Sequence, residues 1–226
     1  KAINGEISFS DIPGIYYRER NKIKKGKELE LIKNLDSIPF PSRKLILKYN
    51  YGNQLNPKIK KGDFTSIITS RGCPYACRFC SRNSVSMKKY RTRSNDNILK
   101  ELKEIQADGY KYVAIVDDSF LANKKQAHEL LDAIIKEQLN LKFIITAARV
   151  DSAEEDLFKK MKKAGVTHIQ YGLESGNQDV LDFYNKNITL EKIKYAVNLS
   201  ERIGFFNMGS FILGAPFETR EHFGNT

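Results

Sequence analysis

The sequence predicts an α/β fold in which parallel strands and helices alternate to form a partial (β/α) barrel, preceded by an irregular linker. From residue 65 onward, short apolar segments alternate five times with segments whose apolar residues recur at helical spacing. The short segments are almost continuously hydrophobic, which is typical of strands buried on both faces. Both observations point to a parallel sheet covered by helices.

Each predicted element follows from a local pattern. Apolar and β-branched runs predict strands at residues 65–69, 112–116, 143–147, 168–172 and 208–213. Ser94 is a candidate N-cap for a helix striped by Ile98, Leu102 and Ile105. Further stripes predict helices near 130–135, 157–161 and 193–203, and from Glu218 onward. Since parallel strands are joined by crossovers of one hand, a partial TIM-like barrel is the most economical closure.

Composition limits the function classes. With 226 residues, 41% of them hydrophobic, the chain is long enough for one sizeable core, and no apolar run is long enough to span a membrane. The formal net charge is +11, of which residues 1–64 contribute +7 and residues 65–226 contribute +4. A basic appendage is compatible with nucleic-acid binding, but no RNA-binding motif accompanies it, and a solvated Lys-rich surface is the simpler interpretation.

Residues 1–64 have the character of a connector. Segments 15–18 and 22–23 flank a polar turn and could pair as a hairpin, prolines at 39 and 41 force an extended path, and 42–47 could form a surface helix. The chain does not begin with Met and stops inside an expected helix, so we expect a fragment of a longer protein. The predicted domains are a linker at 1–64 and a core at 65–226, cut before a sixth strand.

All three cysteines, Cys73, Cys77 and Cys80, lie within eight residues, directly after the first predicted strand. An odd, clustered set is not a disulfide framework, and free thiols favour a reducing compartment such as the cytoplasm. Thiolates at this spacing suit zinc or an iron–sulfur cluster. A closed zinc site needs four ligands and the histidines are remote in sequence, whereas a four-iron cube held by three Cys keeps one iron open. A zinc-stabilised loop stays an alternative.

The Cys-x3-Cys-x2-Cys motif, with Phe79 before its last cysteine, resembles the radical S-adenosylmethionine superfamily. The resemblance implies that Cys73, Cys77 and Cys80 hold a [4Fe–4S] cluster whose open iron binds S-adenosylmethionine. One electron from the cluster would cleave the sulfonium, giving methionine and a 5′-deoxyadenosyl radical that attacks the substrate. A reductant such as flavodoxin or ferredoxin would supply that electron.

Polar residues follow the second, third and fourth predicted strands, where a barrel places its active site. Asp117 and Asp118 could accept hydrogen bonds from an ammonium, and Arg149 suits a carboxylate. The resemblance implies that the acidic pair binds the methionyl amine, Arg149 the methionyl carboxylate and Glu174 the ribose hydroxyls. The alternatives are helix capping by the carboxylates and, for Arg149, an ion pair with Asp151 or Asp118.

The segment after the fifth strand contains Ile212 and Gly214, and Gly214 allows a close backbone approach to a ligand. The resemblance implies that this segment packs against the adenine, although Phe217 stands where the family usually has a small residue. Arg78, Arg91 and Arg93, near the cysteines, could help neutralise the cluster or cofactor, or simply be solvated.

The segments 117–120, 90–94 and 36–41 resemble the cobalamin-associated subgroup of this superfamily. The resemblance adds cobalamin as a cofactor. No Asp-x-His-x-x-Gly motif for cobalamin occurs in these residues, so we expect its binding domain upstream of Lys1. We therefore expect an enzyme that transfers methyl groups or rearranges its substrate. A methylthiotransferase acting on tRNA or protein, and a non-enzymatic zinc or iron–sulfur module, are the alternatives. The residues do not identify a substrate.

Overall fold

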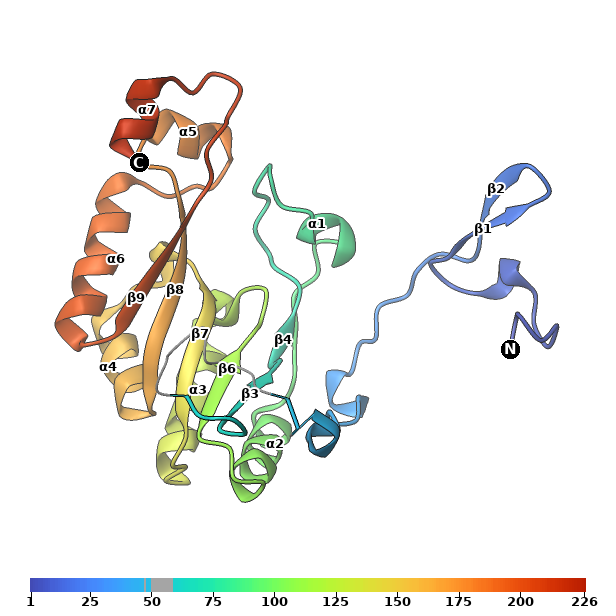
Figure 1. The fold of residues 1–226 in the computed structure, drawn as a ribbon, viewed down its shortest axis with the longest axis horizontal. Coiled ribbons are helices and arrows are strands. Elements are labelled where there is room, and N and C mark those ends of the chain that lie inside the picture. Colours follow the sequence, from blue (N-terminus) through green and yellow to red (C-terminus); the bar gives the residue numbers. More distant parts are fainter. Residues whose placement is uncertain (47, 50–58) are drawn as a thin grey trace. The chain divides into compact units, whose positions relative to one another are not determined.

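The computed structural model describes residues 1–46, 48–49 and 59–226, and the chain divides into two units, Lys1–Leu35 and Asp36–Thr226. The larger unit contains a five-stranded sheet in which every neighbouring pair is parallel (Figure 1). Its strands lie in chain order: β3 (Phe64–Ile67), β6 (Tyr112–Ile115), β7 (Lys142–Ala148), β8 (Val166–Glu174) and β9 (Phe206–Phe211). The predicted α/β fold with parallel strands is confirmed.

Four helices cover one face of this sheet: α2 (Asn95–Ala107), α3 (Lys124–Lys136), α4 (Glu155–Lys163) and α6 (Leu190–Ile203). Each packs against the next in chain order. A doubly wound sheet would reverse its strand order and place helices on both faces, so this arrangement is an arc of a barrel. None of the helices in the described residues is both long and apolar enough to cross a membrane.

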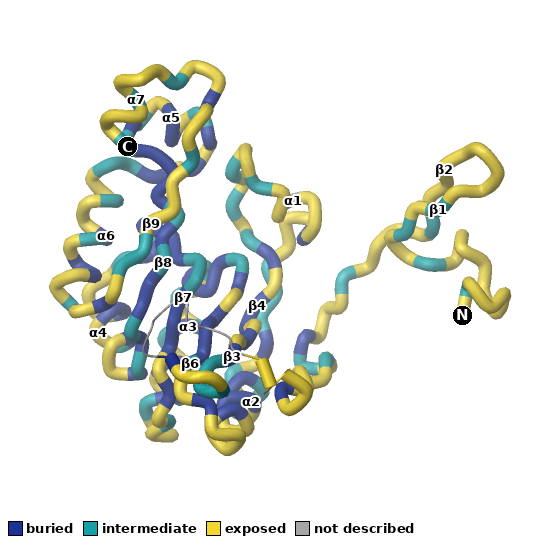
Figure 2. The backbone as a smooth tube through the Cα atoms, in the orientation of Figure 1, coloured by how far each residue is buried: buried dark blue, intermediate teal, exposed yellow. Residues whose placement is uncertain are grey.

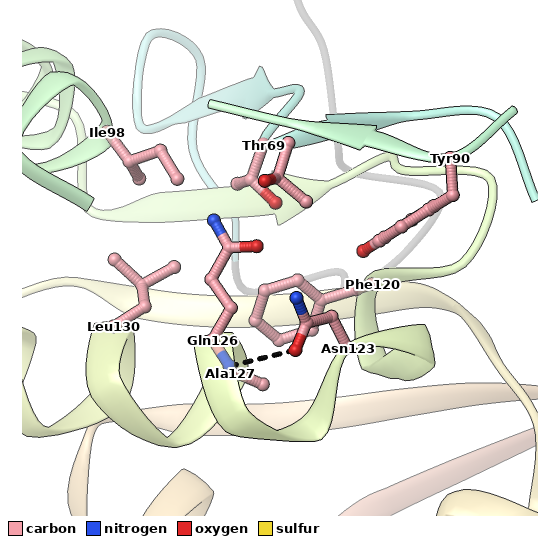
Figure 3. Close-up of a pocket in the computed structure, with 9 residues that line it drawn as sticks. Thr69, Tyr90, Ile98, Phe120, Asn123, Gln126, Ala127 and Leu130 are labelled. Atoms are coloured by element: carbon pink, nitrogen blue, oxygen red, sulfur yellow. Dashed lines mark hydrogen bonds between the residues drawn. The ribbon is translucent and has the colours of Figure 1, made fainter. Parts of the chain in front are cut away.

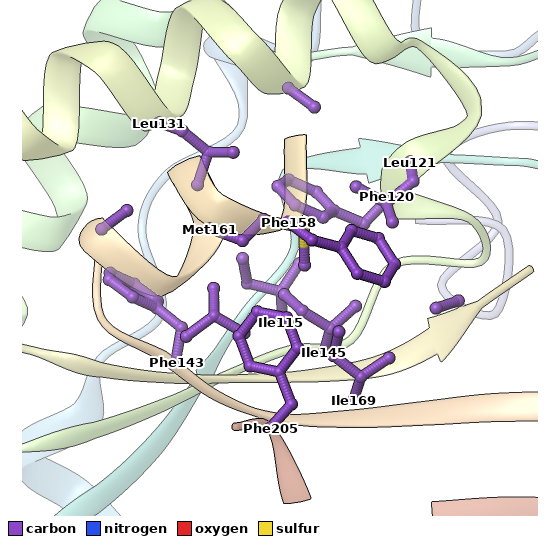
Figure 4. Close-up of a cluster of buried hydrophobic side chains, with 14 of the residues drawn as sticks. Ile115, Phe120, Leu121, Leu131, Phe143, Ile145, Phe158, Met161, Ile169 and Phe205 are labelled. Carbon is purple, nitrogen blue, oxygen red and sulfur yellow. The ribbon is translucent and has the colours of Figure 1, made fainter. Parts of the chain in front are cut away.

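The main core lies between the sheet and these helices (Figure 4). Ile145 and Ile169 from the strands and Phe158 from α4 are completely buried there, and burying each such side chain contributes about 1.5–3 kcal/mol. On the other face of the sheet, Ala114 and Ile144 form a smaller cluster with Ile59, Phe64 and Tyr112. The sheet is therefore apolar on both faces, as its near-continuous hydrophobic strands predict.

The boundaries of the elements differ from prediction in a few places. Ser94 caps α2 as expected and accepts a hydrogen bond from the Asn97 amide. The last helix, α7 (Arg220–Asn225), begins later than predicted because the Glu218 carboxylate accepts hydrogen bonds from the Gly214 and Ala215 amides in the preceding turn. The helix α5 (Gln178–Phe183) and the small ladder of β4 (Ser70–Arg71) and β5 (Arg91–Thr92) were not predicted.

The smaller unit contains the predicted hairpin. Strands β1 (Tyr16–Glu19) and β2 (Lys22–Lys25) pair antiparallel, with Tyr16 opposite Lys25. In the larger unit, a 3₁₀ helix at Arg43–Ile46 replaces the surface helix expected at 42–47, and residue 47 is outside the described residues. The unit boundary after Leu35 groups residues 36–46 with the barrel arc.

A buried ion group attaches residues 36–46 to the sheet. Both Arg43 and Arg93 lie 2.5 Å from Glu101, one on each carboxylate oxygen, and all three side chains are at most one-tenth exposed. Arg43 also donates to Thr65 and Ser66, and Arg93 donates to the Ile68 carbonyl oxygen. The structure thus gives Arg93 a role in packing instead of the expected role in neutralising the cluster.

Candidate active site

The three cysteines lie in the excursion between β4 and β5, beyond the carboxyl end of β3. The excursion begins at Gly72, which has φ +88°, and a Cβ there would lie 2.0 Å from the Lys89 carbonyl oxygen. Only glycine therefore lets the two ends of the excursion meet. Two hydrogen bonds join its middle to the segment after α5: the Arg78 amide donates to the Tyr184 carbonyl at 2.8 Å, and Asn185 donates to the Ala76 carbonyl at 2.9 Å.

The thiols of Cys73, Cys77 and Cys80 are free and partly buried. Burial raises the pKa of Cys73, and the negative charge of the Cys77 and Cys80 thiolates adds to the effect. Among the described residues, no three His, Cys, Asp or Glu side chains gather closely enough to hold one metal ion. A four-iron cube takes each thiolate on a different iron, so its ligands need not converge on one point, and three thiolates fit its chemistry.

The carboxylates after β6 hold the strand that leads into this loop. Asp117 is 3% exposed and accepts hydrogen bonds from the Thr69 amide at 2.6 Å, the Thr69 hydroxyl at 2.5 Å and the Ser70 hydroxyl at 2.6 Å. Burial raises its pKa, although these hydrogen bonds oppose the shift. Asp118 accepts from the Gly72 amide at 2.9 Å. Neither carboxylate caps a helix, and both position the start of the cysteine loop.

Arg149, after β7, reaches the cysteine loop. Its Nη1 lies 3.8 Å from the Cys77 Sγ, and its guanidinium stacks 3.7 Å from the centre of the Tyr75 ring. It also forms the ion pair with Asp151 that was the alternative to a ligand contact, at 2.9 Å. Burial alone would lower the pKa of Arg149, but the hydrogen bonds and charge of Asp151 outweigh burial and raise it. Arg149 is therefore a fixed positive charge beside a predicted cluster ligand.

Glu174 ends β8 in an unusual backbone conformation, with φ +67°. Its carboxylate pairs with Lys186 at 2.5 Å, and both side chains are less than one-tenth exposed. The Glu174 carbonyl oxygen accepts a hydrogen bond from the Ile212 amide at 2.8 Å, which places the fifth strand's end beside the fourth's. A non-glycine residue held in this strained conformation costs of order 1–3 kcal/mol, and such residues cluster at functional sites.

Lys186 links the predicted residues, and sequence reasoning missed it. Its carbonyl oxygen accepts a hydrogen bond from the Arg149 Nη2 at 2.7 Å, while its Nζ binds Glu174 and lies 5.8 Å from the centre of the Phe79 ring. It lies between Asn185 and Asn187 in a loop after α5, twelve residues beyond Glu174. No local pattern marks it, because its partners come from other elements.

Two predicted residues lie at the edge of this group. Phe79 is 42% exposed and packs edge-on against Tyr184, with ring centres 5.2 Å apart. Gly214 has φ +102°, its amide donates to Glu218, and no atom lies within 4 Å of where a Cβ would stand. The backbone at Gly214 is therefore open to a ligand's approach, as its prediction requires.

A small cavity of about 10 Å³ lies among Thr69, Tyr90, Phe120 and Gln126 (Figure 3). That volume is close to the minimum for one water molecule. The cavity is a packing gap behind the strand end, much too small for a nucleoside cofactor.

The family described as the Radical SAM superfamily matches residues 67–226. Among curated proteins, an uncharacterized methyltransferase, PH0819, from Pyrococcus horikoshii is 34% identical over 211 residues, which are 93% of this chain and 44% of that protein. The chain thus spans less than half of this relative's length.

Solved structures share the fold. The cobalamin-dependent S-adenosylmethionine radical enzyme OxsB with aqua-cobalamin bound aligns with 99% of this chain and 33% of its own, at a TM-score of 0.80 and 21% identity. The radical S-adenosylmethionine methyltransferase TsrM from Kitasatospora setae, with tryptophan and an S-adenosylmethionine analogue bound, covers 98% of this chain and 44% of its own, at a TM-score of 0.79 and 17% identity.

Proposed function

Because the chain belongs to the Radical SAM superfamily, we propose that it is the cluster-binding core of an enzyme that transfers methyl groups or carries out a related radical-based group transfer. The cofactors of this family are a [4Fe–4S] cluster and S-adenosylmethionine. One observation carries the proposal: the cysteine loop, Arg149 and Glu174 come from three separate strand ends and are connected through Lys186. Such convergence at the carboxyl ends of parallel strands is typical of a barrel active site.

The residues divide the work as follows. Cys73, Cys77 and Cys80 would hold the cluster, which when bound supplies the electron that cleaves S-adenosylmethionine. Arg149 offers fixed positive charge to the methionyl carboxylate, and its pairing with Asp151 keeps the guanidinium oriented. Lys186 binds the Oε1 of Glu174, and Glu174 offers its Oε2 to the ribose hydroxyls. Ile212 and Gly214 would pack against the adenine.

We assign different roles to Asp117 and Asp118, and only the role of Asp117 departs from the one expected from the sequence. Their carboxylates already accept hydrogen bonds from the strand that precedes the cysteines. We therefore assign Asp117 to positioning that strand, while Asp118, which is more exposed and shares its charge with Arg82, remains the candidate for the methionyl amine.

Cobalamin is the proposed third cofactor. Two observations support it: the resemblance of segments 117–120 and 90–94 to the cobalamin-associated subgroup, and the fold shared with OxsB and TsrM. PH0819, named a methyltransferase, supports methyl transfer as the reaction class.

Product analysis tests the proposal. The cluster-loaded chain is incubated anaerobically with S-adenosylmethionine and a strong reductant, and nucleoside products are identified by mass spectrometry. We expect 5′-deoxyadenosine from the loaded chain and none from the Cys77→Ala variant. If fully loaded protein forms no nucleoside product from S-adenosylmethionine, the proposal is contradicted. A methylthio-modified tRNA or peptide would favour the methylthiotransferase alternative.

A further inference from the structure

From residue 64 onward, the net positive charge is concentrated in one segment. Residues 64–95, which contain the cysteine loop, include seven Lys or Arg and no Asp or Glu. Residues 96–226 include 17 Lys or Arg and 20 Asp or Glu, so the rest of the arc is slightly acidic. A segment this uneven produces a local positive potential that attracts anionic partners.

Part of this charge is exposed and unneutralised. Arg71, Lys88 and Lys89 are exposed, and no carboxylate of the described residues forms an ion pair with them. Exposed apolar side chains accompany them: Val85 is 64% exposed and Met87 is 37% exposed. An apolar centre with a charged rim is the usual anatomy of a protein–protein interface.

These residues frame the cysteine loop. Arg71 is the last residue of β4 and precedes Gly72 directly, while the Lys89 carbonyl lies against Gly72 from the segment that leads back to β5. The excursion extends beyond the end of the sheet (Figure 1), and its surface around α1 (Arg82–Val85) is largely exposed (Figure 2). The charged residues therefore lie on the cluster's own loop and not on the outer helices.

We propose that this cluster-loop surface is the docking site of a small acidic one-electron-transfer protein, and define it as Arg71, Val85, Met87, Lys88 and Lys89. The inference rests on the proposed function, because a cluster that cleaves S-adenosylmethionine must first receive an electron. In that step a reduced flavin or iron–sulfur donor loses one electron and the [4Fe–4S] cluster gains it, with no bond made or broken. Charge complementarity selects an acidic donor and steers its approach.

The test compares two triple charge reversals of the full 226-residue chain. One variant carries Arg71→Glu, Lys88→Glu and Lys89→Glu in the cluster-loop surface. The control carries Lys125→Glu, Lys192→Glu and Lys194→Glu, which are exposed on α3 and α6 and change the net charge equally. Calorimetry measures the Kd of oxidised flavodoxin, an acidic FMN protein, at low and high salt.

We expect the surface variant to bind flavodoxin at least about tenfold more weakly at low salt, and the control to stay within about twofold of the parent chain. Stopped-flow reduction of the cluster by reduced flavodoxin should slow by a similar factor in the surface variant. Reduction by photoreduced deazaflavin, a small molecule that needs no docking surface, should remain nearly unchanged.

Three results would overturn the proposal: equal losses in both variants, no loss in the surface variant, or a loss of affinity for single-stranded RNA with flavodoxin binding unchanged. The last result would identify the surface as a nucleic-acid site. A cluster that no donor reduces would count against the proposed function instead, and the binding measurement would still decide the docking question.

Discussion

Two buried carboxylates, Glu101 and Glu174, are both paired with buried cations, yet they differ in what surrounds them. Glu101 lies in the regular helix α2, and each of its oxygens is bound by an arginine. Glu174 lies at a strand end with positive φ, and its single cationic partner, Lys186, also fixes Arg149. The first group is fully satisfied and joins two segments. The second is strained and connects the residues that face the cysteine loop.

Glu101 and Glu174 form the same type of interaction, but the Glu101 group serves packing and the Glu174 group also lies at the candidate active site. A buried charge that loses its partner is costly, so both groups should affect stability. Only the strained group lies where a ligand could take over one of its bonds, so only that group should affect the binding of S-adenosylmethionine. Variants in the two groups should therefore divide between unfolding and binding measurements.

The largest effect is expected for Glu101→Gln. The amide has the shape of the carboxylate but points a donor group at one of two buried guanidinium groups, Arg43 or Arg93. We expect a loss of about 4 kcal/mol in the free energy of unfolding, measured by urea denaturation. The Kd for S-adenosylmethionine of protein that remains folded should not change. As a control, Glu155→Gln, at a carboxylate that pairs with Lys159 and Arg202 on the surface, should change the free energy of unfolding by less than about 1 kcal/mol.

A smaller loss of stability but a clear loss of affinity is expected for Lys186→Met. The thioether fills the space but leaves the Glu174 carboxylate buried without its cation, so we expect about 2 kcal/mol of destabilisation. Because Glu174 and the ring of Phe79 also lose their common contact, the Kd for S-adenosylmethionine should rise roughly tenfold. Lys186→Arg, which keeps the charge, should restore most of the affinity. If the parent chain, Lys186→Met and Lys186→Arg bind S-adenosylmethionine with the same Kd, the pair of Glu174 and Lys186 has only a structural role.

The smallest effect is expected for Asp117→Asn, because the Asp117 carboxylate accepts hydrogen bonds from neutral donors and pairs with no cation among the described residues. Burial raises the pKa of Asp117 above its ordinary value of 3.8. At any pH between 3.8 and the raised pKa, the folded state binds more protons than the unfolded state. The stability of the parent protein should therefore fall as pH rises through that window. The asparagine variant should cost at most about 1 kcal/mol at acidic pH and less near neutrality. A cost that grows with pH in urea titrations would contradict this.

Sequence patterns predicted what depends on local order. The five strands and the helix after Ser94 follow from apolar spacing and a cap, and both act within a few residues along the chain. The cysteine motif predicted its own loop, and the strand-end rule placed Arg149 and Glu174 near it. These features need only the knowledge that parallel strands end at one edge.

Sequence patterns could not predict how buried charges pair. Arg93 belongs to a motif beside the cysteines, yet it turns toward Glu101 because that carboxylate also needs a partner on its second oxygen. Lys186 lies between two asparagines in a loop, a position that is typical of an exposed residue. The sequence indicates a ligand contact for Asp117, but in the structure its carboxylate accepts hydrogen bonds from the hydroxyls of Thr69 and Ser70. Each of these depends on contacts between residues distant in the sequence.

We propose that the loop of Cys73, Cys77 and Cys80 holds a [4Fe–4S] cluster with one iron open to S-adenosylmethionine. Electron paramagnetic resonance of the anaerobically reconstituted, reduced chain, with and without S-adenosylmethionine, tests it most directly. We expect a [4Fe–4S] signal that changes shape when the cofactor is added, and a smaller change at equal concentration in Lys186→Met. A cluster signal that S-adenosylmethionine leaves unaltered, or a colourless zinc protein, would contradict it.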